Sequence, residues 1–182
     1  RGAWRRPAGA GARPPLRISG QWRGDRGTSP RDGPGTPWHE RGYGDQTNRA
    51  PINEVLAAGR WLWSGWDRRS PFVDPMCGSG TILIEAAMIA LRIPPNHDRA
   101  QFGFERWKDF DADLWKQTYN EAMAKVLTTG PPIIGGEVSP NVARKAIANI
   151  HTAGLEDNIP ISTSAFADLE VPEGAGAGSY TH

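Results

Sequence analysis

Two glycines separated by one residue, Gly78 and Gly80, stand between a short run of β-prone residues and an apolar stretch with helical spacing. Glycine allows a backbone to turn tightly and to lie against a ligand, and the free N–H groups at the start of a helix face an anionic group. A strand, a glycine turn and a helix in this order favour a site for a nucleotide-type cofactor. An ordinary turn between a strand and a helix is the alternative.

A site of this kind also needs a carboxylate at the end of the next strand, where it accepts hydrogen bonds from both hydroxyls of a ribose. Glu137 ends the next predicted strand, but it comes 57 residues after Gly80. The usual separation is about 20 residues. Either residues 94–131 are an insertion, or Glu137 has another role, such as a charge partner for the start of the following helix.

The elements that must position these residues alternate between strands and helices. Hydrophobic spacing and turn residues predict strands at 71–74, 132–138 and 158–163, and helices at 82–93, 111–127 and 140–154. Either Asp109 or Asp111 is expected to cap the middle helix. The order βαβαβ predicts an α/β fold that forms one half of a doubly wound parallel sheet.

The same spacing predicts which helix faces are buried. A helix at 53–66 is expected to bury the apolar residues Val55, Ala58, Leu62 and Trp66, with Leu56 and Trp63 beside them. The helix at 82–93 is expected to bury Ile82, Ala86, Ile89 and Ile93. The helix at 140–154, with Ser139 as N-cap, is expected to bury Ala143, Ile147 and Ile150. The three tryptophans of the first helix could stack on bases, but packing in the core is the commoner use.

The N-terminal part of the chain differs from the rest. Residues 1–51 carry 10 Arg and 4 acids, a net charge of +6, whereas residues 52–182 have a net charge of −5. Residues 1–36 have few aliphatic side chains, and we expect them to form a disordered basic segment. Such a segment could hold nucleic acid phosphates, or it could be an uninformative or out-of-place stretch without a site.

Several classes of protein are excluded. A single cysteine, Cys77, forms no internal disulfide, which suits a reducing compartment. The longest apolar stretch, Thr81–Leu91, is about half the length that a membrane span needs. No apolar run follows the first arginines, so no signal peptide is expected. The chain opens with Arg1 and not with methionine, which indicates a fragment.

Neither a metal site nor a cysteine nucleophile is expected. The four histidines are scattered, and a single cysteine cannot contribute to a structural zinc site. Cys77 as a nucleophile would need a base, and packing within the turn is the favoured role. The alternating acids Asp109, Asp111 and Asp113 suit a helix start better than a calcium loop.

Four segments resemble, in order and spacing, the methyltransferase domain of THUMP-associated RNA guanine-N2 methyltransferases, in particular those that act on large-subunit ribosomal RNA. The segments are RGYGDQTNRAPINEVLAA, FVDPMCGSGTILIEAAMIA, FGFERWKDFDADLW and GGEVSPNVARKAIANIHTAGL, at 41–58, 72–90, 102–115 and 135–155. The resemblance covers about residues 34–173 and accounts for 94–131 as a family insertion.

The resemblance implies a class I fold that binds S-adenosylmethionine (AdoMet). The loop implied to wrap the methionine part of the cofactor consists of Asp74, Pro75, Met76, Cys77, Gly78, Ser79, Gly80 and Thr81. Glu137 would hold the ribose. The segment implied to lead into the domain near the cofactor includes Arg41, Gly42, Tyr43, Ala50 and Pro51.

Two departures from the family pattern bear on function. The family has an acid after its third strand that contacts the adenine amine, but Ala165 stands at that position, with Asp168 three residues later. The resemblance therefore implies weaker adenine recognition, or recognition through the backbone near Phe166. The family's catalytic Asn-Pro-Pro-Tyr signature is not found in the 182 residues, and the chain ends where we expect the fourth strand to begin.

The sequence thus predicts that residues 37–182 are the N-terminal part of an AdoMet-dependent methyltransferase domain with its first three strands only. The intact protein would methylate guanine N2 in ribosomal or transfer RNA in the cytoplasm, while this chain would bind the cofactor weakly and transfer nothing. The alternatives are an amino-group DNA methyltransferase, an NAD-type dehydrogenase and a non-enzymatic basic RNA-binding fragment. The dehydrogenase is disfavoured because the glycine turn lacks the third glycine of its usual signature.

Overall fold

The structure, a computed structural model, describes residues 21–23, 26–28, 40–44, 52–170, 172–173 and 176–179. The chain divides into two compact units, residues 1–31 and 32–182. The second unit contains all the elements predicted from the sequence.

The first unit contains a β-hairpin within the segment expected to be disordered. Strand β1 (Gln21–Arg23) pairs with β2 (Arg26–Thr28) in antiparallel register, with Trp22 opposite Gly27. The intervening pair, Gly24 and Asp25, is of a type that favours a two-residue hairpin turn, a signal that the composition argument overlooked. The expectation of disorder is corrected for these six residues, and the rest of 1–36 lies outside the described residues.

The second unit is built on a parallel sheet, as predicted. Its strands are β3 (Phe72–Asp74), β4 (Ile133–Gly136), β5 (Ile161–Ser162) and β6 (Ala177–Gly178). Their order is β5-β4-β3-β6, and all neighbours are parallel. The expectation of three strands only was wrong, because β6 pairs with the edge of β3 that was expected to be open. The sequence around β6 is GAGAGS, without the β-branched residues that signal a strand.

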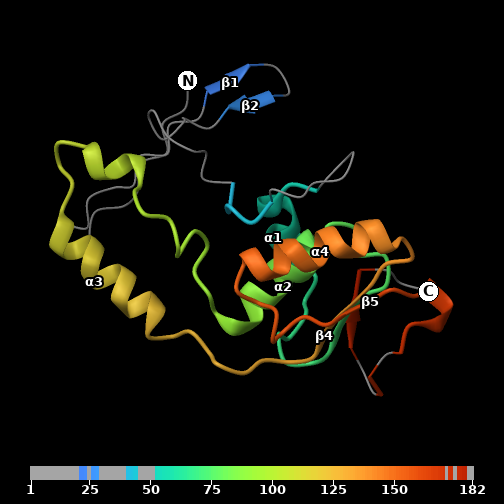
Figure 1. The fold of residues 1–182 in the computed structure, drawn as a ribbon. Coiled ribbons are helices and arrows are strands. Elements are labelled where there is room, and N and C mark those ends of the chain that lie inside the picture. Colours follow the sequence, from blue (N-terminus) through green and yellow to red (C-terminus); the bar gives the residue numbers. More distant parts are fainter. Residues whose placement is uncertain are drawn as a thin grey trace. The chain divides into compact units, whose positions relative to one another are not determined.

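Helices separate these strands. They are α1 (Glu54–Trp63), α2 (Thr81–Leu91), α3 (Ala112–Met123) and α4 (Pro140–Thr152), with short 3-10 turns η1 (Gly103–Arg106) and η2 (Phe166–Asp168). Helices α1, α2 and α4 lie together beside the sheet, whereas α3 stands apart (Figure 1). Side-chain caps begin α1, where Asn53 accepts from the N–H groups of Val55 and Leu56, and α3, where Asp111 accepts from that of Leu114.

Helix α2 lies at the centre of the core. All of its residues except Ile82 and Ile89 are buried, so the helix is apolar all round and no single face stands out. Of the four residues expected to line its buried face, only Ala86 is fully buried, and the three isoleucines are partly buried against the core. Phe72 from the sheet packs edge-on against Trp61, with ring centroids 4.6 Å apart.

The predicted buried face of α1 was wrong. The helix buries Ala57 and Trp61, while Val55, Leu56 and Leu62 are exposed and Trp63 is 94% exposed. Core packing of the tryptophans therefore holds for Trp61, and also for Trp66, which lies beyond the end of the helix. The apolar residues of α1 run round most of the helix, and contact with α2 selects the side that carries Ala57.

Helix α4 also differs in its buried face. Ala143 and Ile150 are buried as predicted, but Ile147 is half exposed, and Ala146 and Asn149 are buried instead. The helix approaches the glycine turn so closely that a methyl group built on Gly80 would lie 3.4 Å from the Ala146 Cβ. The side of α4 that carries Ala146 therefore packs against the glycine turn, which leaves the neighbouring Ile147 half exposed.

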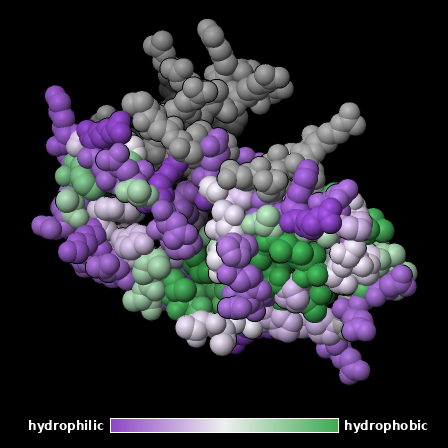
Figure 2. Space-filling model, in the orientation of Figure 1, coloured by the Kyte–Doolittle hydropathy of each residue, from purple (hydrophilic) through white to green (hydrophobic). Residues whose placement is uncertain are grey.

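Residues 94–131, called the arm below, connect α2 to β4 and carry η1 and α3. The arm returns to the body of the unit where the Leu127 N–H donates to the Leu91 carbonyl over 2.8 Å. On the face shown in Figure 2, hydrophobic residues reach the surface in the region of α2 and α4, and hydrophilic residues cover much of the rest. Among the described helices, none is long and apolar enough to cross a membrane.

Candidate functional site

The candidate site lies where the parallel strands end. Because β3, β4, β5 and β6 run in the same direction, their carboxyl ends meet at one edge of the sheet, where ligands of such folds bind. The residues that follow these strands are 75–80 after β3, Glu137 after β4, 163–166 after β5 and Ser179 after β6. Most of the residues predicted for the cofactor lie in the first two of these groups.

The glycine loop leads from β3 into α2 with two residues in the left-handed region. Gly78 has a φ of 58° and Gly80 a φ of 82°, backbone conformations that residues other than glycine rarely adopt. Gly80 is the N-cap of α2, where no side chain caps the helix and no acid lies in the first turn. The N–H groups at this helix start therefore remain available for an anionic ligand, which fits the carboxylate of an amino acid cofactor.

Glu137 joins the glycine loop to the start of α4. Its Oε2 accepts a hydrogen bond from the Gly78 N–H over 3.2 Å, and its Oε1 accepts one from the Ser139 N–H over 2.9 Å. The carboxylate therefore serves the start of α4, one of the two roles left open by the sequence, and it also faces the glycine loop. Its role toward a ribose stays a prediction. A carboxylate has about four acceptor positions, so two remain for a diol.

Asp74 is buried beneath the loop instead of being open to a ligand. It is 1% exposed, and its Oδ1 accepts hydrogen bonds from the Ser179 hydroxyl over 2.7 Å and the Met76 N–H over 3.3 Å. Burial raises the pKa of Asp74 above its ordinary value, although both hydrogen bonds act in the opposite direction. Asp74 therefore shapes the loop and ties it to the end of β6. Ser179 was missed, because it carries no motif and is 105 residues away in sequence.

Cys77 is also a packing residue. Its side chain is buried, and burial together with the nearby charges of Asp74 and Glu137 raises its pKa to about 12. A thiol with this pKa stays protonated at neutral pH and is a poor nucleophile. The interpretation of Cys77 as part of the turn's packing is therefore favoured over a catalytic role.

The remainder of the loop is supported from below by α4. The buried amide of Asn149 donates from its Nδ2 to the Ser79 carbonyl over 2.9 Å. The hydroxyls of Ser79 and Thr81 are buried and 3.4 Å apart. Gly80 accepts the first helical hydrogen bond from Ile84, over 3.0 Å. These contacts hold the loop backbone in one conformation, while Pro75, Met76 and Gly78 form its more exposed part.

The segment after β5 contributes a third side to the strand ends. Phe166 begins η2 and is 41% exposed, and the segment after η2 returns to the sheet, where Leu169 lies close to Gly136. Ala165, at the position of the family's acid, is the N-cap of η2. The preceding Ser164 has a buried hydroxyl with no hydrogen-bond partner in the part of the chain that the structure describes.

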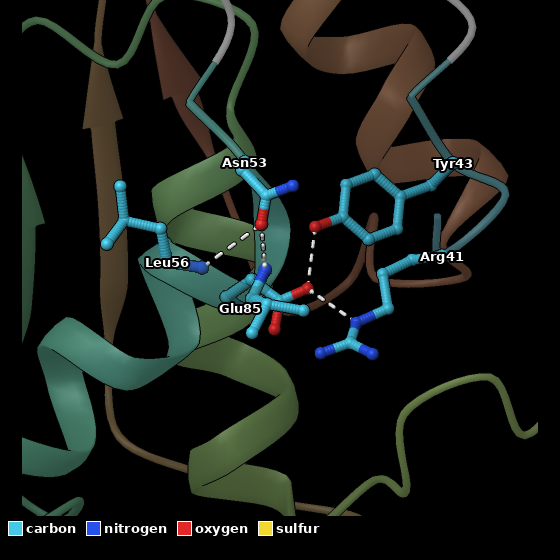
Figure 3. Close-up of polar contacts among 6 residues, drawn as sticks. Arg41, Tyr43, Asn53, Leu56 and Glu85 are labelled. Atoms are coloured by element: carbon cyan, nitrogen blue, oxygen red, sulfur yellow. Dashed lines mark hydrogen bonds and ion pairs between the residues drawn. The ribbon is translucent and has the colours of Figure 1, made fainter. Parts of the chain in front are cut away.

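A polar cluster ties residues 40–44 to α2. The buried carboxylate of Glu85 accepts from the Tyr43 hydroxyl over 2.7 Å and from Arg41 Nε over 3.3 Å (Figure 3). Burial raises the pKa of Glu85, while Tyr43 and Arg41 act to lower it. The segment with Arg41, Gly42 and Tyr43 thus contacts α2, the helix that follows the glycine loop. Ala50 and Pro51, predicted for the same segment, lie outside the described residues.

Sequence reasoning did not assign a partner to Glu85. The available signal was an acid within the apolar stretch Thr81–Leu91, since a buried carboxylate requires a partner. Within the described residues, no group of three or more His, Cys, Asp or Glu side chains could hold a metal ion.

A parallel sheet ordered β5-β4-β3-β6, with a glycine loop after β3 and an acid after β4, has the arrangement of a class I methyltransferase. Comparison with known proteins identifies the family more narrowly. The chain belongs to the RMKL-like methyltransferase domain family, whose model matches residues 41–177.

Curated relatives carry the name ribosomal RNA large subunit methyltransferase K/L. The protein from Photobacterium profundum is 40% identical over 179 residues, and that from Vibrio campbellii is 37% identical over 177 residues. The alignments cover 96% and 95% of this chain, so they extend into residues 1–36 and argue that this stretch is not out of place. The chain spans only about a quarter of the length of these relatives, 25% in both cases.

Solved structures agree with this family. A protein described as a methyltransferase in complex with SAH aligns at a TM-score of 0.69 and 34% identity, over 79% of this chain and 37% of that chain. A protein from Listeria monocytogenes, described as a predicted N6-adenine-specific DNA methylase, aligns at the same TM-score and identity over 79% of this chain and 38% of that chain.

Proposed function

We propose that this chain forms the AdoMet-binding part of an RNA guanine-N2 methyltransferase that acts on large-subunit ribosomal RNA in the cytoplasm. The names of the curated relatives support the RNA substrate, and the similar structure in complex with SAH, the demethylated product of AdoMet, supports the cofactor. The single observation that carries the proposal is the Glu137 carboxylate hydrogen-bonded to the Gly78 amide, beside the uncapped start of α2.

Different residues at the strand ends would bind different parts of the cofactor. The N–H groups at the start of α2 would receive the carboxylate of its methionine part, and Glu137 would accept hydrogen bonds from its ribose hydroxyls. Phe166, exposed beyond the end of β5, would lie against the adenine. When bound, the cofactor supplies a methyl group already activated by its sulfonium. Asp74, Asn149 and Ala146 act from below by fixing the loop.

Methyl transfer to guanine N2 requires more than these residues provide. The exocyclic amine is a weak nucleophile because its lone pair is conjugated with the ring, so acceptors for its N–H groups and in-line positioning are needed. The family's Asn-Pro-Pro-Tyr signature, which would supply them, is not among the 182 residues. We therefore propose that this chain binds cofactor but does not itself transfer the methyl group.

Cofactor binding is tested by calorimetric titration of this chain with SAH and AdoMet. Replacing Glu137 with alanine removes the proposed ribose acceptors, and we expect affinity to fall about 10- to 100-fold, as for the loss of a hydrogen bond to a charged group. Gly78→Asp should abolish binding through steric and charge repulsion. Glu156→Ala, which removes an exposed acid outside the site, is the matched control. Absence of binding by the unmodified, folded chain would overturn the proposal.

A DNA amino-methyltransferase is the second candidate, because one similar solved structure is described as an N6-adenine-specific DNA methylase. The two functions are separated by offering ribosomal RNA and DNA to a longer chain in which an Asn-Pro-Pro-Tyr signature follows β6. Transfer of labelled methyl groups to guanine N2 of RNA is expected. Transfer to adenine in DNA would favour the second candidate.

A further inference from the structure

The arm carries an aromatic cluster of its own, separate from the core around α2. Phe104 lies at its centre, with ring centroids 5.1 Å from Phe102, 4.9 Å from Trp115 and 5.9 Å from Phe110. Neither η1 nor α3 has a fully buried residue. Large apolar side chains that stay partly exposed on a projecting segment are typical of a surface that binds a partner.

Trp107 is the most exposed ring of this cluster that contacts Phe104. Its side chain is 58% exposed, and its ring meets Phe104 edge-on at 6.3 Å. Its backbone is fixed on both sides, since its N–H donates to the Phe104 carbonyl over 3.0 Å and its carbonyl accepts from the Phe110 N–H over 3.1 Å. The backbone at Trp107 is therefore fixed, and the indole contacts Phe104 along one edge while it remains open to solvent. Less conformational entropy is lost when a flat group stacks on such a ring than on a fully free side chain.

The charges beside Trp107 indicate which partner fits. The flanking residues Arg106 and Lys108 are both exposed, and neither forms a salt bridge within the described residues. Arg106 donates instead to the neutral side-chain oxygen of Gln101. Two cations on either side of an exposed indole match a nucleotide, whose base stacks on the ring and whose phosphates pair with the cations.

Four acids lie close to Trp107 in sequence, and three of them already have a role. Glu105, next to Arg106, accepts from the Phe102 N–H over 2.9 Å. Asp111 is engaged as the N-cap of α3, accepting from the Leu114 N–H over 2.9 Å. Asp113 lies in the first turn of α3, where the helix dipole compensates a negative charge. Asp109 is the one acid beside Lys108 that has no such role in the described contacts. A duplex keeps its bases stacked on each other, so the exposed ring favours a single-stranded segment.

We propose that the arm is a binding site for single-stranded RNA, with Trp107 stacking on a base and Arg106 and Lys108 holding the flanking phosphates. This inference rests on the proposed RNA substrate and adds where the RNA is held. Trp63 provides a matched comparison, because it is 94% exposed but stands between Leu62 and Ser64 without flanking cations.

The test is fluorescence anisotropy of a labelled single-stranded RNA oligonucleotide with the full 182-residue chain. We expect Trp107→Ala to weaken binding roughly 5- to 100-fold, as for the loss of one stacked base, and Trp107→Phe to restore much of the affinity. Trp63→Ala should bind as the unmodified chain does. Equal affinity of Trp107→Ala and the unmodified chain, as a protein-docking arm would give, overturns the proposal, and so does an equal loss in Trp63→Ala.

Salt dependence separates the arm from the arginine-rich residues 1–36. Binding by those arginines weakens steeply between about 50 and 200 mM salt, whereas a loss of stacking in Trp107→Ala should persist at both concentrations. The double variant R106A/K108A should reduce the slope of log affinity against log salt by about 1.4, for two phosphates on a single strand. An unchanged slope overturns the assignment of these two cations.

A titration of Trp107→Ala with SAH distinguishes failure of this inference from failure of the proposed function. We expect SAH affinity to be unchanged in that variant, because Trp107 lies on the arm and not at the strand ends. If the unmodified chain binds no SAH but loses RNA affinity in Trp107→Ala, the cofactor proposal fails and the RNA site stands. If the unmodified chain binds SAH but its RNA affinity does not change in Trp107→Ala, the RNA site fails and the cofactor proposal stands.

Discussion

Gly80 occupies a position that no other residue type fills without strain. Its φ of 82° lies in the left-handed region, and an added methyl group would lie 3.4 Å from the Ala146 Cβ. We expect Gly80→Ala to lower the free energy of unfolding by about 1–2 kcal/mol, the cost of a left-handed conformation with a Cβ. Urea unfolding of the purified variant measures this value.

Gly59 is the matched control for this substitution. It lies inside α1, and an added methyl group would have nothing within 4 Å. Gly59→Ala should raise the free energy of unfolding by up to about 1 kcal/mol, because alanine is the better helix former. If both substitutions had the same effect, the strained conformation of Gly80 would not be the cause.

Asp74 makes stability depend on pH in a direction set by its burial. Because its pKa is higher in the folded chain than the ordinary value of 3.8, the ionised carboxyl is disfavoured in the folded state. Its stabilising contribution is complete below the unfolded pKa and is lost as the pH rises through the folded pKa. Asp74→Asn should remove this dependence while its side-chain oxygen still accepts from Ser179 and Met76.

The measurement for Asp74 is the difference in unfolding free energy between the unmodified chain and Asp74→Asn, over a series of pH values. Glu85, whose pKa is also raised, is present in both proteins, so its contribution cancels in the difference. We expect the variant to gain stability relative to the unmodified chain as pH rises above 3.8. A difference that is constant with pH would contradict the assignment.

At the scale of the elements, two helices with similar start residues differ in what those residues do. The Asn53 side chain accepts from the N–H groups of Val55 and Leu56 at the start of α1, whereas Ser139 at the start of α4 makes no side-chain cap. We expect Asn53→Ala to cost about 0.5–2 kcal/mol and Ser139→Ala to cost much less. Thermal unfolding of the two variants provides the comparison, and equal losses would contradict it.

The sequence predicted the positions of strands and helices better than it predicted which faces of the helices are buried. The strands β3 and β4, the buried helix α2 and the Asp111 cap of α3 follow from local signals that the structure confirms. The buried side of α1 does not follow from local signals, because several sides of this helix are apolar and the contact with α2 determines which of them is buried. The buried side of α4 is set by its close approach to Gly80, a contact that helical spacing does not contain.

At the scale of the molecule, the site also combines residues that local sequence signals predict with residues that only long-range contacts reveal. Gly78, Gly80 and Glu137 were predicted because each follows a strand and has a residue type suited to its role. Ser179 and the partners of Glu85 were not, since they reach their contacts across 105 and 42–44 residues of sequence. Residues 177–178 also lack a strand pattern, so only the completed sheet reveals β6.

Strand β6 should contribute to stability and protect the edge of β3. The Ala177 N–H donates to the Pro71 carbonyl over 2.9 Å, and proline at this position removes that hydrogen bond. We expect Ala177→Pro to cost about 1–3 kcal/mol and to increase aggregation, because an exposed strand edge pairs with other chains. Urea unfolding and light scattering measure the two effects. Glu173→Pro, at an exposed position outside the strands, should change neither.

The central place of β3 also sets an order of events during synthesis. The strand leaves the ribosome before either of its neighbours, and the bond between Asp74 and Ser179 joins residues 105 positions apart. A nascent chain therefore holds Phe72 and its unpaired backbone without native partners until β4, and later β6, emerge. Distant pairing of this kind slows folding, so during translation this segment is exposed to aggregation until its partner strands emerge.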